Sequence, residues 1–493
     1  MSVAPSLLDR VRELLRAGAE AFADGAEGAH LRTATERLDQ PLRLAIAGRV
    51  KAGKSTLLNA LVGQELAPTD AGECTRIVTW YLDGPTYRVT LVPIEGSPRQ
   101  ATFTKEEGPI AVDLGGLSHE AVERLEVEWP SPNLRALTLV DTPGIASATA
   151  TGERARTWLV PEDGEDEEPA PVDALLYLMR HVHGTDVRFL EAFHDREAGY
   201  PSPVNALGVL SRADEIGAAR LDAMTSAGRI AARYREDPRI RRLCQTVVPL
   251  AGLLAQAGTA LTEAHFRTLA AVAAMPREAA DALLLSADRF GSMEVEGAPP
   301  PVDRARLQRL LGLFGVRVSV ALIRQHAAPD GPTLAAELVR RSGLAELRQV
   351  IAERFEARRD VLRARSGLLA VEGALGRAGG EPRELATEAE RGRAGAHEFA
   401  EMRLLSLLRA GAAGLQGPDA EEAERVVAGG TVQARLGLDE GADRSEVLAA
   451  LGDAVTRWRE RAESPLSGRA RAGAAEVVVR SLEGMAATVT AAG

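Results

Sequence analysis

Three scarcities narrow the classes of protein to which this 493-residue chain can belong. Aromatic residues make up only 4% of the sequence, so a core must be built mainly from Leu, Val and Ala. The two cysteines, Cys74 and Cys244, lie far apart and lack metal-ligand spacing, which argues against a disulfide framework. Because there is no run of about 18 uncharged apolar residues and no signal-peptide pattern at residues 1–10, we expect a cytoplasmic protein without a transmembrane helix.

Lysine is also scarce: Lys51, Lys54 and Lys105 are the only lysines among 59 basic residues. Two of them fall within the short segment 48–55, which suggests that arginine would not fit at those two positions. The net charge is -11 and the pI about 5.5. This balance argues against nucleic acid as a partner, because neutralising phosphates requires clustered basic residues.

Short apolar runs alternate with helical stretches through the first half of the chain. Strands are predicted at 42–47, 77–82, 87–93, 125–129, 134–140, 172–178, 206–210 and 246–250. A helix is predicted at 55–61, and apolar residues at helical spacing predict one or two helices within 5–40. Alternating strands and helices imply an α/β fold with a mostly parallel, doubly wound sheet.

After about residue 258 the strand signal almost disappears. Long amphipathic stretches take its place, at 307–323, 333–369, 388–408 and 445–462. We therefore expect an α/β domain over 41–258 and an extended all-α bundle and stalk over 259–493. Residues 1–40 are expected to pack with the helical bundle.

The segment 48–55 reads GRVKAGKS and fits the phosphate-loop pattern GxxxxGK[ST]. Its glycines let backbone N–H groups turn towards phosphates, and the following helix directs its positive end at them. Lys54 is expected to reach the β and γ phosphates, and the Ser55 hydroxyl to ligate Mg²⁺. The expected nucleotide contacts are Gly48, Arg49, Val50, Lys51, Ala52, Gly53, Lys54, Ser55 and Thr56.

Two further segments predict contacts to the metal and the γ phosphate. The tetrapeptide DTPG at 141–144 follows an apolar strand, so Asp141 is expected to hold a Mg²⁺-bound water and the Gly144 N–H to bond the γ phosphate. Between the two motifs, a threonine must bond Mg²⁺ and γ phosphate for the loop to sense hydrolysis. We assign Thr75, with Thr69 as the alternative.

Guanine recognition is predicted at SRAD, residues 211–214, after the strand 206–210. The Asp214 carboxylate can accept hydrogen bonds from guanine N1–H and the 2-amino group, which adenine does not offer. Arg212 and Ser211 replace the more usual Lys and Asn or Thr, and the flat guanidinium can still lie along a base. A backbone N–H at Ala251 or Gly252 is expected to bond guanine O6.

Together these segments resemble the dynamin-like GTPases, most closely the bacterial isoniazid-inducible proteins of the C type. The resemblance is carried by GRVKAGKSTLLNALVG, PTDAGECTRIVTW, LVDTPG and SRADEIG, and continues through LLGLFGVRVSVAL, SGLAELRQVIAERF and HEFAEMRLLSLL, so it covers most of the chain. It implies a GTPase head on a helical bundle and stalk, Mg²⁺ as cofactor, and GTP as substrate. It also implies self-assembly, through a GTPase-domain homodimer or a heteromer with a related dynamin-like protein, and membrane remodelling at the inner face of the plasma membrane.

One departure from the family pattern concerns catalysis. Dynamin-like proteins usually carry Gln and then Ser where this chain has Val50 and Lys51. Val50 cannot hydrogen-bond a water through its side chain. Lys51 resembles the internal arginine finger of the guanylate-binding proteins and could place positive charge near the β–γ bridge. We hypothesise that Lys51 replaces a bound monovalent cation and acts in catalysis with Lys54 and Thr75.

Membrane contact rests mainly on this resemblance. Segment 310–323 is apolar but too short to span a bilayer and is typical of a core helix, and the arginines between 229 and 242 are typical of a solvated helix face. An alternative function is therefore a regulatory or scaffolding GTP-binding partner of a longer dynamin-like protein, with slow hydrolysis and no direct membrane action.

Overall fold

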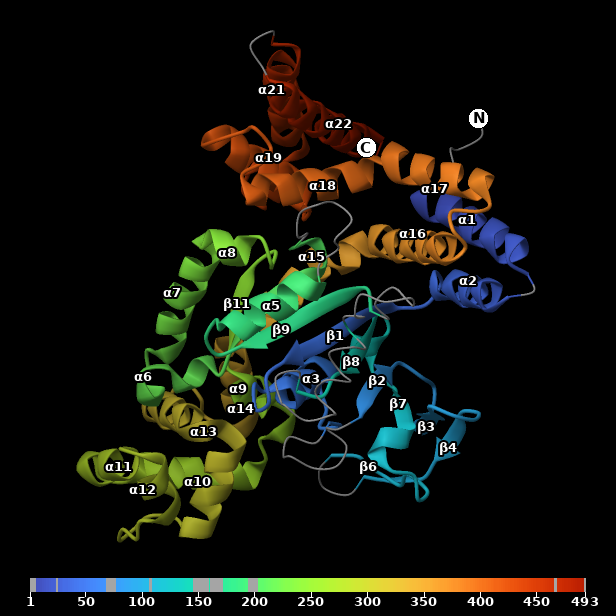
Figure 1. Cartoon of the computed structure of the whole chain (residues 1–493). Coiled ribbons are helices and arrows are strands. Elements are labelled where there is room, and N and C mark those ends of the chain that lie inside the picture. The colour runs from blue at the N-terminus through green and yellow to red at the C-terminus, as the bar shows by residue number, and fades with distance from the viewer. Residues whose placement is uncertain are drawn as a thin grey trace.

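A nine-stranded mixed sheet forms the centre of the molecule (Figure 1). The computed structural model describes residues 6–23, 25–67, 77–105, 109–144, 159, 172–193, 203–464 and 468–491. In spatial order the strands are β11 (Val247–Leu250), β10 (Ala206–Ser211), β9 (Ala174–Met179), β1 (Leu42–Gly48), β8 (Leu137–Asp141), β2 (Val78–Leu82), β7 (Val122–Glu128), β3 (Arg88–Pro93) and β4 (Arg99–Ala101).

The first five strands of this order, β11 to β8, are parallel to one another. Strand β2 runs antiparallel to β8 and parallel to β7, and β3 is antiparallel to both β7 and β4. A separate two-stranded sheet pairs β5 (Phe103–Thr104) with β6 (Ala111–Val112). The predicted mostly parallel α/β sheet is thus confirmed, with an antiparallel extension at one edge.

Helices make up most of the remaining described chain. The first are α1 (Leu7–Ala21), α2 (Ala26–Arg37), α3 (Lys54–Val62), α5 (Gly184–Phe193), α6 (Ile216–Ala219), α7 (Ala223–Glu236), α8 (Pro238–Arg241) and α9 (Gly252–Ala260). After these come α10 (Glu263–Ala274), α11 (Arg277–Leu283), α12 (Ala287–Ser292), α13 (Pro301–Arg324), α14 (Gly331–Arg341), α15 (Leu344–Arg354) and α16 (Arg359–Arg377). The last are α17 (Arg383–Gly395), α18 (His397–Ala410), α19 (Pro418–Ala428), α20 (Val432–Leu436), α21 (Arg444–Glu463) and α22 (Arg469–Ala491).

The central strands are buried on both faces because helices cover both. Side chains alternate across a strand, so Leu44 and Ile46 of β1 enter a different core from Ala45 and Ala47. The first pair packs in a cluster with Leu58 of α3, and the second pair in a cluster with residues of α5. Continuous apolar runs are expected for parallel strands covered on both sides, which explains why these strands could be read from the sequence.

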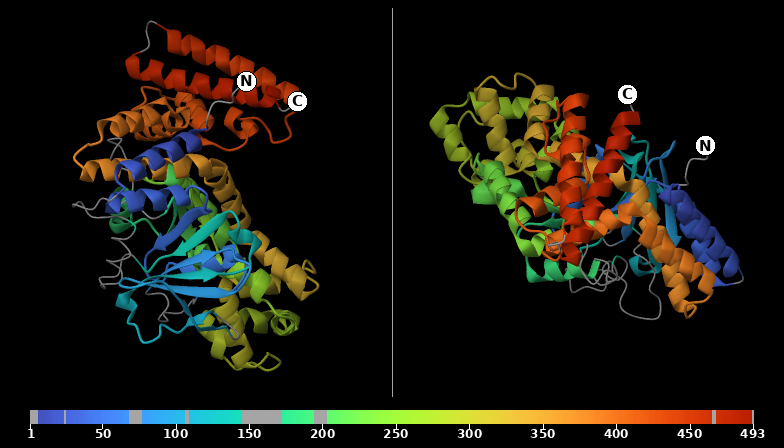
Figure 2. Two further views of the ribbon diagram at one scale, coloured as in Figure 1. Left: turned by 90° about the vertical axis from the view of Figure 1, so that its right-hand side faces the viewer. Right: turned by 90° about the horizontal axis from the view of Figure 1, so that it is seen from above.

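Two groups of helices lie at opposite ends of the sheet (Figure 2). Helices α10 to α13 form a group at one end, with their own apolar core around Leu307, Leu311 and Phe314. Helices α16 to α22 lie at the other end, where α1 packs against α2, α16 and α17, and α21 pairs with α22. No helix within the described ranges has both the length and the apolar character needed to span a bilayer.

Several sequence predictions for the helical half are confirmed. Helix α13 covers the predicted segment 307–323 and is a core helix, with Leu307, Val316 and Leu322 buried. The predicted stretch 333–369 is divided into α14, α15 and α16. The short strands β4, β5 and β6 were not predicted, because they pair in exposed hairpins without an alternating apolar pattern.

A buried carboxylate fastens the sheet to helices α2 and α16. Asp173, 4% exposed, lies just before β9. Its oxygens accept hydrogen bonds from Arg37 Nη2 at 3.1 Å, the Arg43 backbone N–H at 2.8 Å and the Ser366 hydroxyl at 2.9 Å. One side chain therefore joins helix α2, strands β1 and β9, and helix α16.

The substitution Asp173→Asn is expected to lower the free energy of unfolding by about 3 kcal/mol, because it leaves the Arg37 guanidinium without its anionic partner. The measurement is the urea midpoint of the full chain. Asp360→Asn is the matched control, since Asp360 on α16 is 61% exposed and lies 3.9 Å from Arg363. Because the Asp360 carboxylate is exposed and lies at long range from its partner, its loss should cost less than about 1 kcal/mol, so equal destabilisation by the two substitutions would contradict this role of Asp173.

Candidate functional site

The predicted phosphate loop connects strand β1 to helix α3. Gly48, with φ +147°, ends the strand against β9, and a Cβ there would lie 2.5 Å from the Leu178 carbonyl oxygen. Gly53 has φ +94° and precedes the first residue of α3, Lys54. Both positions exclude a side chain, the first by contact and the second by backbone conformation. The loop thus has the strand–loop–helix context that phosphate binding requires.

Lys54 is held over this loop. Its Nζ lies 3.3 Å from the Gly48 carbonyl oxygen and 3.4 Å from that of Arg49. Burial lowers the pKa of the Lys54 ammonium, and the nearby Asp141 carboxylate partly opposes this effect. A buried cation with weak carbonyl partners is well suited to phosphate oxygens.

Ser55 and Asp141 meet where the adjacent strands β1 and β8 end. The Ser55 hydroxyl lies 3.4 Å from Asp141 Oδ2, and Asp141 is 8% exposed. Asp141 Oδ1 is buried and has no hydrogen-bond partner in the described part of the chain. Burial raises the pKa of Asp141 to about 6, against the opposing effects of Lys54 and Ser55. A hydroxyl beside an unpartnered carboxylate oxygen fits Mg²⁺, which prefers oxygen ligands and keeps several waters.

The DTPG turn lies directly on the phosphate loop. A Cβ on Gly144 would lie 2.4 Å from Val50 Cγ2 and 3.0 Å from the Val50 backbone nitrogen, so only glycine fits there. Val50 itself is 53% exposed and Lys51 has φ +61°. Thr75 and Thr69 lie outside the described residues.

The predicted base-reading segment occupies the end of β10, two strands from β1. Asp214 is 6% exposed, and burial raises its pKa to about 6. Arg212 has φ +52°, and its guanidinium pairs with Glu215 at 2.6 Å. The Ser211 hydroxyl is buried without a hydrogen-bond partner among the residues described. The segment therefore brings a buried carboxylate and an arginine to the same edge of the sheet as the phosphate loop.

The role assigned to Ala251 changes with the structure. Its backbone N–H, expected to face guanine O6, donates instead to the Ser342 carbonyl oxygen at 2.9 Å. The amide that remains for this role is that of Gly252, the first residue of α9. A Cβ on Gly252 would lie 3.0 Å from Thr56 Cγ2, so α9 approaches the phosphate-loop helix closely here.

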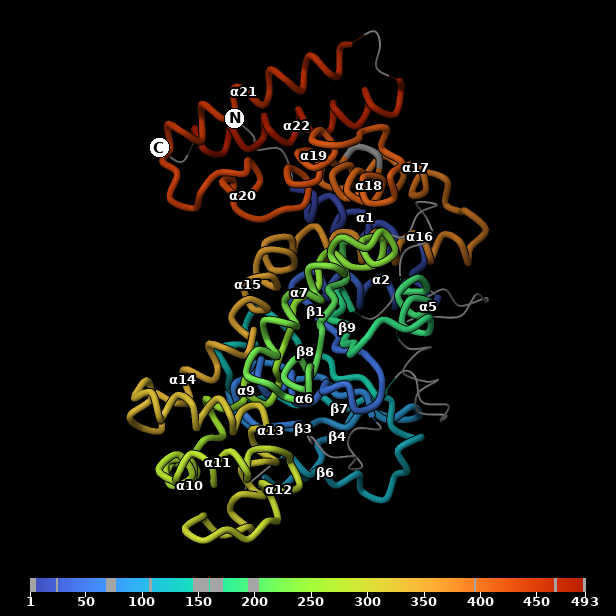
Figure 3. Tube along the Cα trace, turned by 90° about the vertical axis from the view of Figure 1, so that its left-hand side faces the viewer, coloured from blue at the N-terminus to red at the C-terminus, as the bar shows by residue number. Residues whose placement is uncertain are grey.

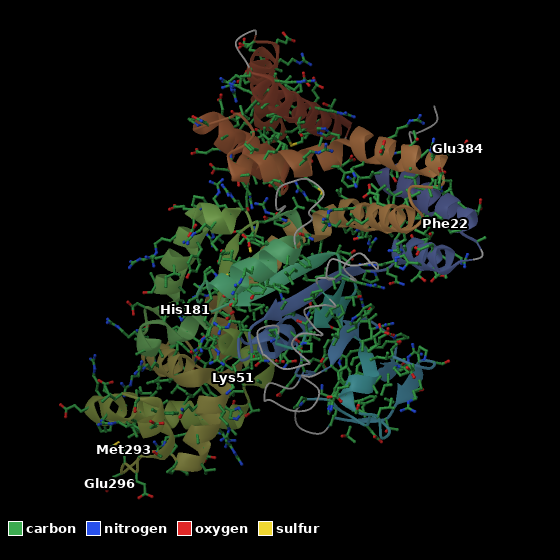
Figure 4. All side chains as sticks on the ribbon, viewed as in Figure 1. Phe22, Lys51, His181, Met293, Glu296 and Glu384 are labelled. Carbon is green, nitrogen blue, oxygen red and sulfur yellow. The ribbon has the colours of Figure 1, made fainter. Side chains whose placement is uncertain are left out.

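A cavity of about 320 Å³ opens beside the phosphate loop and was not predicted. Arg49, Arg180, His181 and His183 are among its lining residues. Arg180 also pairs with Glu215, which links the cavity to the base-reading segment. In Figure 4, Lys51 and His181 lie at the end of the sheet nearer α13, away from Phe22 at the end of α1 and Glu384 in α17.

Comparison with known proteins shows the family to which the chain belongs. The model of the dynamin family matches residues 44–85, which contain the phosphate loop. Isoniazid-induced protein IniC of Mycobacterium tuberculosis is 39% identical over 99% of both chains. The chain belongs to the dynamin family, with IniC as a full-length relative. It is thus a member of a family of GTPases.

Two further matches are weaker, one over a small part of the chain and one over all of it at low similarity. The bacterial dynamin-like protein of Nostoc punctiforme is 33% identical over 132 residues, 24% of this chain and 19% of that protein. A solved structure of an oligomerised bacterial dynamin pair is 13% identical, with a TM-score of 0.33, and covers 100% of this chain and 74% of that one.

We expect the raised pKa of Asp214 to make a guanine preference depend on pH. The ionised carboxylate is the form that can accept the guanine hydrogen bonds, and a group with a pKa of about 6 goes from about nine-tenths ionised at pH 7 to about one-tenth at pH 5. We expect the ratio of GDP to ADP affinity, measured by calorimetry, to fall up to about tenfold over this range. The ratio cancels titration of the phosphates, so a constant ratio would contradict the prediction.

Proposed function

We propose that this protein binds GTP with Mg²⁺ and hydrolyses it to GDP and phosphate. The observation that carries the proposal is the convergence of Lys54, Ser55, Asp141 and Asp214 on one edge of the sheet, at the ends of β1, β8 and β10. Parallel strands end at the same edge, which is where open α/β sheets bind ligands.

In this proposal each residue has a distinct part. The amides of the phosphate loop and the Lys54 ammonium bind the β and γ phosphates and stabilise the negative charge there during in-line attack by water. Ser55, Thr75 and, through water, Asp141 hold the Mg²⁺, which neutralises charge on the phosphate oxygens. Gly144 places its N–H towards the γ phosphate, and Asp214 selects guanine.

The catalytic water has no obvious protein ligand at Val50, whose exposed side chain is apolar. We propose that Lys51 acts nearby instead, supplying the charge that a monovalent cation would otherwise provide at the β–γ bridge. Lys51 lies in the same loop and has a left-handed backbone conformation, which is uncommon for a non-glycine residue and supports a constrained role.

We expect GTP turnover by the wild type to be independent of potassium. Lys51→Ala should lose about tenfold or more of its turnover in sodium buffer, because charge stabilisation at the bridge is lost, and should regain part of it in potassium. Steady-state phosphate release measures this, with Lys105→Ala as the control lysine. Unchanged turnover in Lys51→Ala would refute the assignment.

Helix α15 offers a physical connection between the nucleotide site and the helical half. Arg348 of α15 donates to the Ala60 carbonyl oxygen at 3.0 Å, near the end of α3, the helix that follows the phosphate loop. Gly343, just before α15, lies so close to β11 that a Cβ would be 2.2 Å from the Pro249 carbonyl oxygen. Since α15 leads through a short turn into α16, a shift of α3 or β11 would be transmitted to α16 and the helices packed on it.

We further propose that nucleotide state controls self-assembly, as a homodimer through the GTPase domain or a heteromer with a related dynamin-like protein. The proposed location is the cytoplasm, with peripheral contact at the inner face of the plasma membrane.

The proposed domains are the GTPase domain, residues 41–258, and the helical bundle and stalk, residues 259–493. The exposed Val50 favours the alternative of a regulatory GTP-binding partner with slow turnover.

Purified protein is expected to hydrolyse GTP faster than ATP in Mg²⁺. Lys54→Ala should lose at least about a hundredfold in turnover, because its ammonium stabilises the transferred phosphate. Asp214→Asn should shift preference towards xanthine nucleotides, since its amide can donate to the xanthine 2-oxo group.

The same assay separates the two functions. Turnover per molecule that rises with protein concentration or with liposomes supports the mechanochemical function, and slow, concentration-independent turnover supports the regulatory one. Guanine preference retained by Asp214→Asn would contradict the base-reading assignment.

A further inference from the structure

Helix α13, outside the sheet, lies against the base-reading carboxylate. At Gly312 the helix is interrupted, with φ +65° and ψ 172°. A Cβ at this position would lie 3.6 Å from Asp214 Oδ2 and 3.3 Å from Leu253 Cδ1 of α9. The kink therefore brings the α13 backbone, free of any side chain, next to Asp214 and the start of α9, as the course of α13 beside α6 and α9 indicates (Figure 3).

The chain that follows the SRAD motif has an unusual conformation. Gly217, Ala218 and Ala219 have φ values of +64°, +59° and +58°. Alanine rarely adopts this left-handed conformation, because its Cβ crowds the following carbonyl group. Two consecutive alanines in it must be held by contacts from outside the segment.

Arg317 of α13 supplies those contacts. Its guanidinium makes five hydrogen bonds to four backbone carbonyl oxygens, all between 2.7 and 3.0 Å. Nη1 donates to Ala218 and Ala219, while Nε and Nη2 donate to Leu284 and Leu285, just after α11. One side chain thus uses its whole donor fork to fasten the strained segment to the α11–α12 turn.

Two other arginines of the same helix show that this connection is specific. Arg304 donates to the carbonyl oxygens of Phe290, Met293 and Pro299, and Arg324 to those of Ala273 and Met275. These acceptors all belong to the α10–α13 group. Of the three arginines, Arg317 is the one that bonds the segment that follows Asp214.

We propose that helix α13 is a wall of the base pocket, and that Arg317 is a positioning residue for guanine selectivity. Because Gly312 has no side chain, the α13 backbone can lie beside the Asp214 carboxylate. Arg317 fixes the segment 217–219, which follows Asp214 and holds it in place. The α10–α13 group thereby senses which purine is bound. This inference rests on the proposed function, because it assigns the determinants of selectivity to the same GTP site.

The test is the ratio of GDP to ADP affinity for full-length variants, measured by calorimetry in Mg²⁺ at pH 7.5. Arg317→Gln should lower the ratio at least tenfold, mainly by weakening GDP, because Asp214 loses its fixed position. ADP affinity, which reports the phosphate contacts, should change less than threefold. Arg317→Lys, which keeps the charge and some of the donors, should give an intermediate ratio.

Arg324→Gln is the matched control, since it removes from the same helix a carbonyl-bonded arginine that makes no bond to the segment 211–219. Its ratio should stay within twofold of wild type, whatever stability it loses. A wild-type preference for GDP that Arg317→Gln leaves unchanged would overturn this inference alone. A wild type with no preference for GDP would overturn the proposed function and this inference with it.

Hydrogen exchange on the wild type makes the test independent of whether Arg317→Gln folds. GDP should slow the exchange of amides at 217–219 and 312–317, whereas ADP at equal saturation should have a smaller effect. The segment 273–275, bonded by Arg324, should be unaffected by either nucleotide. Equal effects of GDP and ADP on 312–317 would overturn the proposal.

Discussion

The site depends on the placement of a cation and a carboxylate out of water at the ends of two adjacent parallel strands. The opposite charges of Lys54 and Asp141 offset part of the cost of burying each group. Part of the cost remains, because the ammonium makes long contacts to carbonyl oxygens and one carboxylate oxygen has no described partner. A buried pair in this state favours ligands that bring both negative oxygens and a hydrated cation. The close approach of Gly144 to Val50 holds the segment that follows Asp141 against the phosphate loop that leads to Lys54.

Much of the sheet could be predicted from the sequence because each buried strand is a short, continuous apolar run. Apolar runs of the right length, each ending in Gly48, Asp141 or Ser211, gave the strands and the motifs that follow them. Tertiary features were less accessible. The hydrogen bond from Ala251 to Ser342 joins residues far apart in sequence, and no local pattern announces it. Similarly, Gly312 reads as an ordinary helix glycine until Asp214 is found beside it.

In the proposed function, helices α15 and α13 would give the nucleotide two separate physical contacts with the rest of the chain. At the phosphate side, Arg348 of α15 fastens the end of α3, and α15 continues into α16. At the base side, α13 meets Asp214, and its group lies at the opposite end of the sheet from α16 to α22 (Figures 1 and 2). Hydrolysis would change the first contact and leave the second in place, because GDP retains its base. The phosphate side would therefore follow the reaction, and the base side the presence of nucleotide.

Several arginines join separate elements of the chain by bonding backbone carbonyl groups. Arg317, Arg354 and Arg358 each bond backbone carbonyl groups of another element. Burial lowers the pKa of Arg358 to about 10, so even this guanidinium keeps its proton at neutral pH and below. Carbonyl groups do not titrate. In mild acid the carboxylates of Asp141 and Asp214 would become neutral while these arginine–carbonyl contacts kept their charge, so nucleotide release would precede the loss of the contacts made by Arg317, Arg354 and Arg358.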